Sequence, residues 1–341
     1  MEESLRELGE LRVVERIISR LRSSWGCDAI EPGDDATCTR IGDKGEYILL
    51  KIDGASFESV KLPWIEWRDV GWQQVIGVAS DLIAKAARPL LFVVSIGISP
   101  EEEYSIVDNI IKGVHEAAVA CGGWLGGGDT NSCEWREKKC GWIDIAAIGY
   151  SRRPLGRSPL VGDYVYTTIG RIGYGGVVMH SLNTSSWKDD IKQYKEIFRE
   201  FSRPSPRISF VELVERVGLK CITGSIDVSD GLAFSLYLLG RASGGAIVVD
   251  NLPTRDTVYE YSRDKGVGVE ELVFYGGQEY EIVFTVRPRC VEDVEDVARR
   301  IKLDVERVGR IDIGLKGTIF FRGRRIKVMR WDNFLGVSSL F

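Results

Sequence analysis

The chain has 341 residues, of which 44% are apolar, 10% aromatic and 28% charged. These proportions are ordinary for a globular protein, and the length suggests two domains of about 150 residues each. The net charge of −5 gives no reason to expect nucleic acid as a partner, because nucleic-acid binders usually carry a basic excess. No window reaches the roughly 18 apolar residues of a membrane helix, and residues 1–22 lack the apolar core of a signal peptide. We therefore expect a cytoplasmic protein that does not bind a membrane.

The spacing of apolar residues predicts alternating helices and strands. In chain order we expect a helix at 5–21, a Gly/Asp/Pro stretch at 31–36, a strand at 47–52, a helix at 69–87, a strand at 90–98, a helix at 101–121 and a strand at 142–149. Residues 152–162 are rich in Arg, Pro and Gly and are predicted to link two domains. A strand at 164–169, helices at 186–201, 210–217 and 231–241, strands at 245–249 and 281–286, and a helix at 292–300 follow. This order indicates an α/β or α+β fold with domains at residues 1–150 and 151–341.

The seven cysteines are scattered, their number is odd, and no CxxC pair occurs. We therefore expect most of them to be buried or free thiols and predict no zinc site. Cys133 and Cys140 stand seven residues apart and could pair. Scarce Gln, Met and His point toward a thermophile, in which intracellular disulfides are conceivable.

Three common nucleotide or nucleophile motifs are missing: GxxxxGK[ST], GxGxxG after a strand, and GxSxG. What stands out instead is aspartate in five turn-like segments: 33–36, 51–54, 80–81, 126–130 and 226–231. A carboxylate at the end of a strand points toward the crevice where open sheets bind ligands. Clustered carboxylates repel a polyphosphate unless cations lie between them, and Mg²⁺ prefers oxygen ligands. The pattern therefore indicates Mg²⁺-dependent phosphoryl transfer from ATP, which needs positioning and charge neutralisation.

Each segment also has a simpler explanation. Asp and Gly are turn residues, so a single Asp-Gly pair is more often a turn than a site. Asp81 could be the i,i+4 ion-pair partner of Lys85 on a helix. Gly77, Ser80 and Ala84 nevertheless give this helix a small polar face suited to close approach of a ligand.

The ordered series of motifs resembles the thiamine-monophosphate kinase family, within the superfamily of aminoimidazole ribonucleotide synthetase. The similarity runs from about residue 6 to 335 and includes the segments 33–36, Asp53, 80–84, 88–89, 127–130, 157–158, 203–207, 226–232, 276–281 and 331–334. The resemblance implies a two-domain aminoimidazole ribonucleotide synthetase-like fold. Its N-terminal domain would dimerise through its sheet, giving a homodimer, and its C-terminal domain would be an α/β sandwich. The implied reaction moves the γ-phosphoryl of ATP onto thiamine phosphate.

The resemblance also assigns residues. Mg²⁺ would be bound by Asp35, Asp53, Asp81, Asp129, Asp227 and Asp230, of which Asp129 and Asp230 would be catalytic. ATP would be bound by Gly128, Asp129, Arg157 and Ser229, and the acceptor by Trp331, Gln278 and Val60. Arg157 could alternatively be a solvated linker charge, and Trp331 a core aromatic. The guanidinium of Arg157 suits bidentate phosphate binding, and the indole of Trp331 suits a cationic thiazolium.

Several positions depart from the family pattern. Lys51-Ile52 replaces a hydroxyl pair before Asp53, Val60 replaces a substrate-side histidine, Gln278 replaces a carboxylate, and Lys85-Ala86 replaces Met-Gly. These changes keep the predicted Mg²⁺-binding aspartates. They concern instead the identity of the molecule that accepts the phosphoryl group. The alternatives are another ATP-dependent superfamily member, such as an aminoimidazole ribonucleotide synthetase, a catalytically silent ATP-binding paralogue, or a phosphohydrolase. Selenophosphate synthetase and the hydrogenase-maturation protein are disfavoured, because Cys27 lacks a glycine-rich setting and the chain ends in Leu-Phe.

Overall fold

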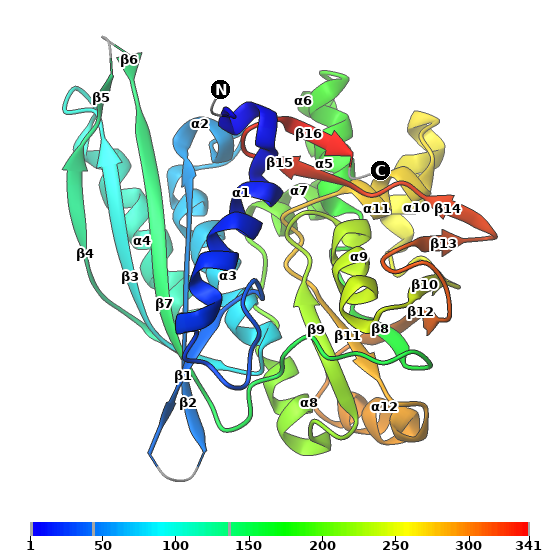
Figure 1. Ribbon diagram of the computed structural model, residues 1–341. Helices are drawn as coiled ribbons and strands as arrows, with labels where there is room; N and C mark the ends of the chain where they lie inside the picture. Colours follow the sequence, from blue (N-terminus) through cyan, green and yellow to red (C-terminus); the bar gives the residue numbers. More distant parts are fainter. Residues whose placement is uncertain (1–2, 43–44, 136–137, 340–341) are drawn as a thin grey trace.

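The computed structural model describes residues 3–42, 45–135 and 138–339 (Figure 1). Within these ranges the first half forms a five-stranded sheet in the order β1-β2-β7-β3-β4. Its strands are β1 (Thr37–Ile41), β2 (Glu46–Ser56), β3 (Arg88–Ile98), β4 (Trp124–Ser132) and β7 (Gly141–Ser151), with the small hairpin β5 (Glu134–Trp135) and β6 (Lys138–Lys139) beside them. Only the β3–β4 pair is parallel in this sheet. No helix in the described ranges is both long and apolar enough to span a bilayer.

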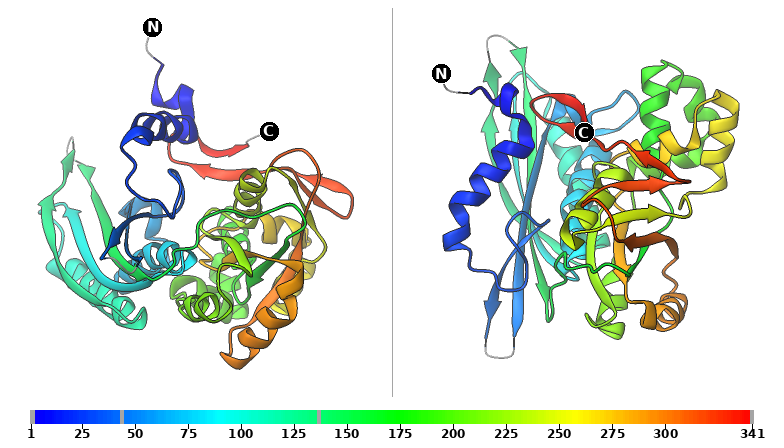
Figure 2. Two further views of the ribbon diagram at one scale, coloured as in Figure 1. Left: turned by 60° about the horizontal axis from the view of Figure 1, so that its bottom comes forward. Right: turned by 45° about the vertical axis from the view of Figure 1, so that its right-hand side comes forward.

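Helices cover one face of this sheet. The long helices α3 (Trp67–Ala84) and α4 (Tyr104–Ala120) pack on it, with the short α2 (Phe57–Val60) at the end of β2 (Figures 1 and 2). Alternate strand residues such as Leu49, Phe92 and Ile145 are fully buried against the helices. Residues of the opposite face stay open, and Ile52 is 65% exposed. The sheet therefore keeps an apolar face that the described part of the single chain leaves open.

A seven-stranded sheet organises the second half, in the order β14-β13-β10-β12-β8-β11-β9. Its strands are β8 (Tyr164–Thr168), β9 (Ile222–Asp227), β10 (Ala246–Val249), β11 (Ile282–Val286), β12 (Val305–Asp312), β13 (Ile319–Phe321) and β14 (Arg324–Ile326). One face packs on α9 (Leu232–Ser243) and the other on α8 (Ser209–Val217) and α12 (Val291–Arg300). The remaining helices are α5 (Tyr174–Asn183), α6 (Trp187–Gln193), α7 (Lys195–Ser202), α10 (Asp256–Lys265) and α11 (Val269–Tyr275), with one-turn 3₁₀ helices η1 (Arg22–Ser24) and η2 (Pro288–Cys290). Helices on both faces of a sheet make this half an α/β sandwich.

Helix α3 joins the two halves. The Trp72 indole N–H donates to the Pro204 carbonyl at 2.7 Å, and the Gln73 amide donates to the Phe201 carbonyl at 2.7 Å. Arg203 lies over the Trp72 ring at 4.3 Å and forms an ion pair with Glu116 of α4 at 2.8 Å. These contacts are partly desolvated, so they fix the second half against the helical layer of the first.

The N-terminal helix α1 (Leu5–Leu21) lies beside the C-terminal hairpin of β15 (Met329–Asp332) and β16 (Gly336–Ser339) (Figure 1). The Glu10 backbone N–H donates to the Asp332 carboxylate at 2.9 Å, and Asn333 donates to Glu10 at 2.8 Å. Gly9 has φ 69° and is the buried residue of this helix, where a Cβ would stand 2.9 Å from Leu335. The predicted helix at 5–21 is present but kinked, because the backbone is not helical at Gly9. Its apolar side chains remain 41–53% exposed at Leu5, Val14, Ile17 and Leu21.

The predicted mixed α/β class is confirmed by the two sheets and the helices around them, while several local predictions are wrong. Residues 126–130, predicted as a loop, belong to strand β4. The predicted helix at 186–201 is two helices, because Tyr194 takes a non-helical conformation between them. Strand β9 and helices α5, α10 and α11 were not predicted. Glycines hide α5 and β9 from a periodicity argument, because Gly175, Gly176 and Gly224 interrupt their apolar patterns.

The expectation for the cysteines is also wrong. Among the described residues, disulfides join Cys27 to Cys38, Cys133 to Cys140, and Cys221 to Cys290, and Cys121 is a buried thiol. The prediction failed because the fold brings together cysteines that are far apart in the sequence, such as Cys221 and Cys290, which are 69 residues apart. The suggested pairing of Cys133 with Cys140, which flank the β5–β6 hairpin, is confirmed.

Candidate metal and nucleotide site

Three predicted metal ligands meet between the two halves of the chain. Carboxylate oxygens of Asp35, Asp81 and Asp227 lie within 4.8 Å of one another. Asp35 comes from the loop before β1, Asp81 from the last turn of α3, and Asp227 from the end of β9. Asp81 and Asp227 are buried, 7% and 4% exposed. The segments are far apart in sequence, so the cluster forms only when the loop of Asp35, helix α3 and strand β9 come together in the fold.

Small residues on α3 allow this approach. A Cβ on Gly77 would stand 3.4 Å from the Tyr280 ring, at the limit of an ordinary contact. One turn further, the Ser80 hydroxyl donates to Asp227 at 2.5 Å. The predicted small polar face of this helix therefore lies against the end of β9, where it holds the Asp227 carboxylate.

Two cations hold the loop that carries Asp35. The Lys85 ammonium is fully buried and lies 2.7 Å from Asp34 and 2.9 Å from Asp35. It also donates to the Ser225 carbonyl at 2.6 Å. Arg157 bridges the same two carboxylates, at 2.8 Å from Asp34 and 2.6 Å from Asp35. The interpretation of Arg157 as a solvated linker charge is therefore wrong.

A third cation reaches the cluster from β2. The Lys51 ammonium lies 2.8 Å from Asp81, and its side chain is 23% exposed. Since Lys85 pairs with Asp34 and Asp35, the suggested i,i+4 ion pair between Asp81 and Lys85 is wrong. The Asp81 side chain thus points into the carboxylate cluster and toward Lys51, and not along its own helix toward Lys85.

The carboxylates are not equivalent. Burial favours the neutral form of Asp35, but Arg157 and Lys85 outweigh it and hold the pKa of Asp35 below its ordinary value. Burial raises the pKa of Asp81 to about 7 against the opposing effect of Lys51. Burial and the neighbouring Asp81 raise the pKa of Asp227 well above its ordinary value. The protein's own cations therefore leave part of the cluster's negative charge uncompensated.

The residues fit a divalent ion of the Mg²⁺ type. The converging side-chain atoms are carboxylate oxygens, which such ions prefer. The raised pKa values of Asp81 and Asp227 show that their charged forms are disfavoured in the protein alone. A bound cation would stabilise those charged forms.

Two further predicted ligands lie on the rim. Asp53 is exposed on β2, two residues beyond Lys51, and accepts from the Gly54 N–H at 2.9 Å. Asp230 follows β9, and burial raises its pKa to about 6. Neither belongs to the group of three carboxylates that lie within mutual reach.

The loop at 276–281 packs on the Asp230 segment. Gln278 has φ 58°, and its N–H donates to the carbonyl of the exposed Ser229 at 2.7 Å. Glu279 is 1% exposed and accepts from the Gly173 N–H at 2.7 Å. The loop is thus anchored by Glu279 and presents Gln278, partly exposed, beside Ser229.

Asp129 and Gly128 are not brought to the cluster within one chain. They lie on the edge strand β4, in register with Ser95 of β3, Asp144 of β7 and Gly54 of β2. Three strand spacings separate Asp129 from Gly54, which is roughly 14 Å. The register also places Asp129 on the open face of the sheet, opposite the face of Lys51.

The predicted acceptor-binding residues lie in contrasting environments. Trp331 is 56% exposed on β15, so its alternative interpretation as a core aromatic is wrong. Val60 is 5% exposed and belongs to the hydrophobic core around α3. This placement leaves Val60 little surface for direct contact with a ligand.

Sequence reasoning gave no site role to Asp34, Lys51 or Lys85, and it named Ser80 only as part of a small polar face of the helix. The signal for the two lysines was available, because both stand at departures from the family pattern. Asp34 is adjacent to the predicted ligand Asp35, but its carboxylate forms ion pairs with Lys85 and Arg157.

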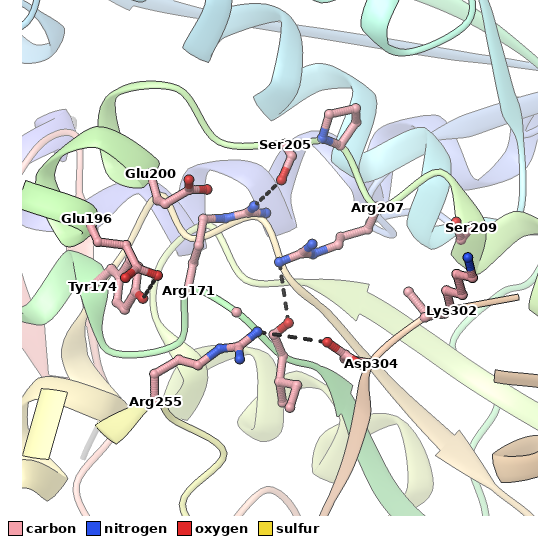
Figure 3. Close-up of a pocket in the computed structure, with 14 residues that line it drawn as sticks. Arg171, Tyr174, Glu196, Glu200, Ser205, Arg207, Ser209, Arg255, Lys302 and Asp304 are labelled. Atoms are coloured by element: carbon pink, nitrogen blue, oxygen red, sulfur yellow. Dashed lines mark hydrogen bonds and ion pairs between the residues drawn. The ribbon is translucent and has the colours of Figure 1, made fainter. Parts of the chain in front are cut away.

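A separate cavity of about 320 Å³ lies on the second half (Figure 3). Arg171 donates to Ser205 at 3.1 Å, and Arg255 is directed toward Asp304 at 3.9 Å. Arg207 and the 2% exposed Arg171 are both ion-paired with Glu281. The two inner arginines are therefore engaged with the protein, and none of the three clustered aspartates lines this cavity.

The fold and the aspartate cluster define an aminoimidazole ribonucleotide synthetase-like protein. The family of AIR synthase related proteins, N-terminal domain, matches residues 33–151. The structure of tt0281 from Thermus thermophilus superposes with a TM-score of 0.82 at 29% identity, covering 95% of this chain and 99% of that one. AaThiL complexed with AMPPCP and TMP superposes with a TM-score of 0.81 at 23% identity, covering 98% and 99%.

One curated relative shows which family within this group the chain belongs to. The thiamine-monophosphate kinase of Pyrobaculum calidifontis is 30% identical over 289 residues, covering 85% of this chain and 88% of that protein. The chain belongs to the thiamine-monophosphate kinase family.

Proposed function

We propose that this protein transfers the γ-phosphoryl of Mg²⁺-bound ATP directly to thiamine phosphate, giving thiamine diphosphate. The observation that carries the proposal is the convergence of Asp35, Asp81 and Asp227 on one point between the two halves. Membership of the family supports the same reaction, as does the complex of AaThiL with an ATP analogue and TMP.

The protein's own residues supply positioning and charge. Asp81 and Asp227 would hold Mg²⁺, with Asp53 and Asp230 completing the ligands from the rim. When bound, the ion neutralises phosphate charge during transfer. Ser80 orients Asp227, and Lys85 with Arg157 fixes the loop of Asp35. The acceptor is itself a phosphate and already carries a nucleophilic oxygen, so the site needs no dedicated general base.

The acceptor would contact the rim of the cluster. The exposed Trp331 can stack on a cationic ring, because an aromatic face attracts positive charge. Gln278 stands beside Ser229 and can donate or accept a hydrogen bond. Val60 would act indirectly, by packing the end of β2 from within the core.

We also propose a homodimer that pairs the open faces of two N-terminal sheets. Leu50, Ile52 and Val93 of that face are 40–65% exposed in the single chain. An apolar face of this kind marks an interaction surface. Asp129 points from the same face, so it would lie at this dimer interface. Size-exclusion chromatography with light scattering tests the dimer, and Ile52→Lys should yield monomers.

A single assay tests the reaction. The protein is incubated with Mg²⁺, ATP and thiamine phosphate, and thiamine diphosphate is measured by chromatography, with thiamine and an aminoimidazole precursor as alternative acceptors. Product from thiamine phosphate alone supports the proposal. ATP binding without product would favour a silent paralogue, and ADP formation without an acceptor would favour a phosphohydrolase.

A further inference from the structure

Lys51 occupies a special place in the cluster. Its partner on β7, Ala147, is buried under the helices, so Lys51 lies on the helix-covered face and not on the open one. Its ammonium lies 2.8 Å from Asp81, while 23% of its side chain remains exposed. Lys51 is therefore inside the group of carboxylates and still faces solvent.

Lys85 differs from Lys51 in both respects. Lys85 is fully buried, and its ammonium is surrounded by Asp34, Asp35 and the Ser225 carbonyl, all within 2.9 Å. An ammonium has three donors, so Lys85 has none left for a ligand. Lys51 has one carboxylate partner among the described contacts, Asp81. Two of its three donors can therefore turn toward a ligand.

The distribution of charge gives Lys51 a role. Lys85 and Arg157 pair with Asp34 and Asp35, which leaves Lys51 as the cation paired with Asp81. A second Mg²⁺ ion between Asp81 and a phosphate group, beside the ion that Asp81 and Asp227 would hold, would be repelled by this ammonium. The ammonium can instead bridge Asp81 and a phosphate oxygen itself, as a compact point charge.

We propose that Lys51 is a built-in cation of the site, which takes the place of one divalent ion between Asp81 and the nucleotide phosphates. The inference rests on the proposed use of metal-bound ATP but not on the identity of the acceptor. It predicts that the wild-type protein with bound nucleotide holds one divalent ion fewer than the same protein without the Lys51 charge.

The test counts metal ions on the whole protein. Mn²⁺ is titrated into the protein saturated with AMPPCP, and free Mn²⁺ is followed by electron paramagnetic resonance. Lys51→Met should bind one additional ion, or bind its weakest ion about tenfold or more tightly, because a positive charge has left the cluster. Lys51→Arg keeps the charge and should match the wild type. Lys112→Met, an exposed lysine of α4 paired with Asp108, is the matched control and should change nothing.

Equal Mn²⁺ number and affinity in the wild type and Lys51→Met would overturn the proposal, and so would weaker binding in the variant. Circular dichroism checks the fold, and Lys51→Thr repeats the titration with a smaller side chain if Lys51→Met does not fold. This titration and the kinase assay test separate proposals, and either can fail without the other. An extra ion in Lys51→Met without thiamine diphosphate from the wild type would refute only the acceptor. Product without an extra ion would refute only the role of Lys51.

Discussion

Replacing Lys85 with Met should destabilise the protein strongly. The ammonium is fully buried and has two carboxylate partners within 2.9 Å. Removing one partner of a buried ion pair costs about 3–5 kcal/mol, because the remaining charge is left buried. Unfolding entropy of about 2.1 cal/mol/K per residue gives roughly 0.7 kcal/mol per degree for 341 residues. The melting temperature of Lys85→Met should therefore fall by roughly 4–7 °C.

Calorimetry at two pH values checks the cause. Lys85 and Arg157 hold the pKa of Asp35 below its ordinary value, so this group adds stability above the unfolded pKa of about 3.9 and loses it as the pH falls through the folded pKa. The fall in melting temperature caused by Lys85→Met should be largest at pH 7 and should become smaller below about pH 4. Lys112→Met, which removes an exposed ion pair with Asp108, should stay within about 1 kcal/mol of the wild type. A Lys85→Met melting temperature equal to that of this control at pH 7 would refute the reasoning.

Three further outcomes are expected. Asp81→Asn should lower transfer by at least about a hundredfold with the fold retained, because the Mg²⁺ that would neutralise charge at the transferring phosphate loses a ligand; normal turnover would remove Asp81 from the metal site. Trp331→Ala should raise the acceptor KM while the ATP KM stays unchanged, since the indole is exposed on β15 and is proposed to stack on the acceptor; steady-state kinetics with each substrate varied decides this. The pKa of Glu116 is lowered to about 2, first by its hydrogen bond to Arg68 and then by Arg203, against burial. Glu116→Gln should therefore lower the melting temperature at pH 7 but not near pH 2, and an equal loss at both would contradict the ion pair.

The sequence contained enough to predict the strongly periodic elements. Helices α1, α3 and α4 and strands β3 and β7 follow the expected positions closely, because each carries a long apolar pattern. Strand β4 was missed because four of its nine residues are glycine or aspartate, which favour turns in isolation. Its pairing with β3 supplies the backbone hydrogen bonds that make it a strand.

The site was predictable in part. Asp35, Asp81 and Asp227 were assigned as metal ligands through the family resemblance, and the structure brings them together. The roles of Lys51, Lys85 and Asp34 could not be derived, because each depends on which residue lies nearby after docking. A lysine in a sequence shows its charge but not its burial, and here one of the two lysines is fully buried while the other is partly exposed.

The cluster draws Asp35 and Asp81 from the first half and Asp227 from the second, and Lys85 reaches across to the Ser225 carbonyl. Neither half alone contains the site. Two fragments cut within residues 152–162 would therefore be inactive when separate, and could regain activity only by reassociating along α3. Loosening that contact would take the site apart even with both halves still folded.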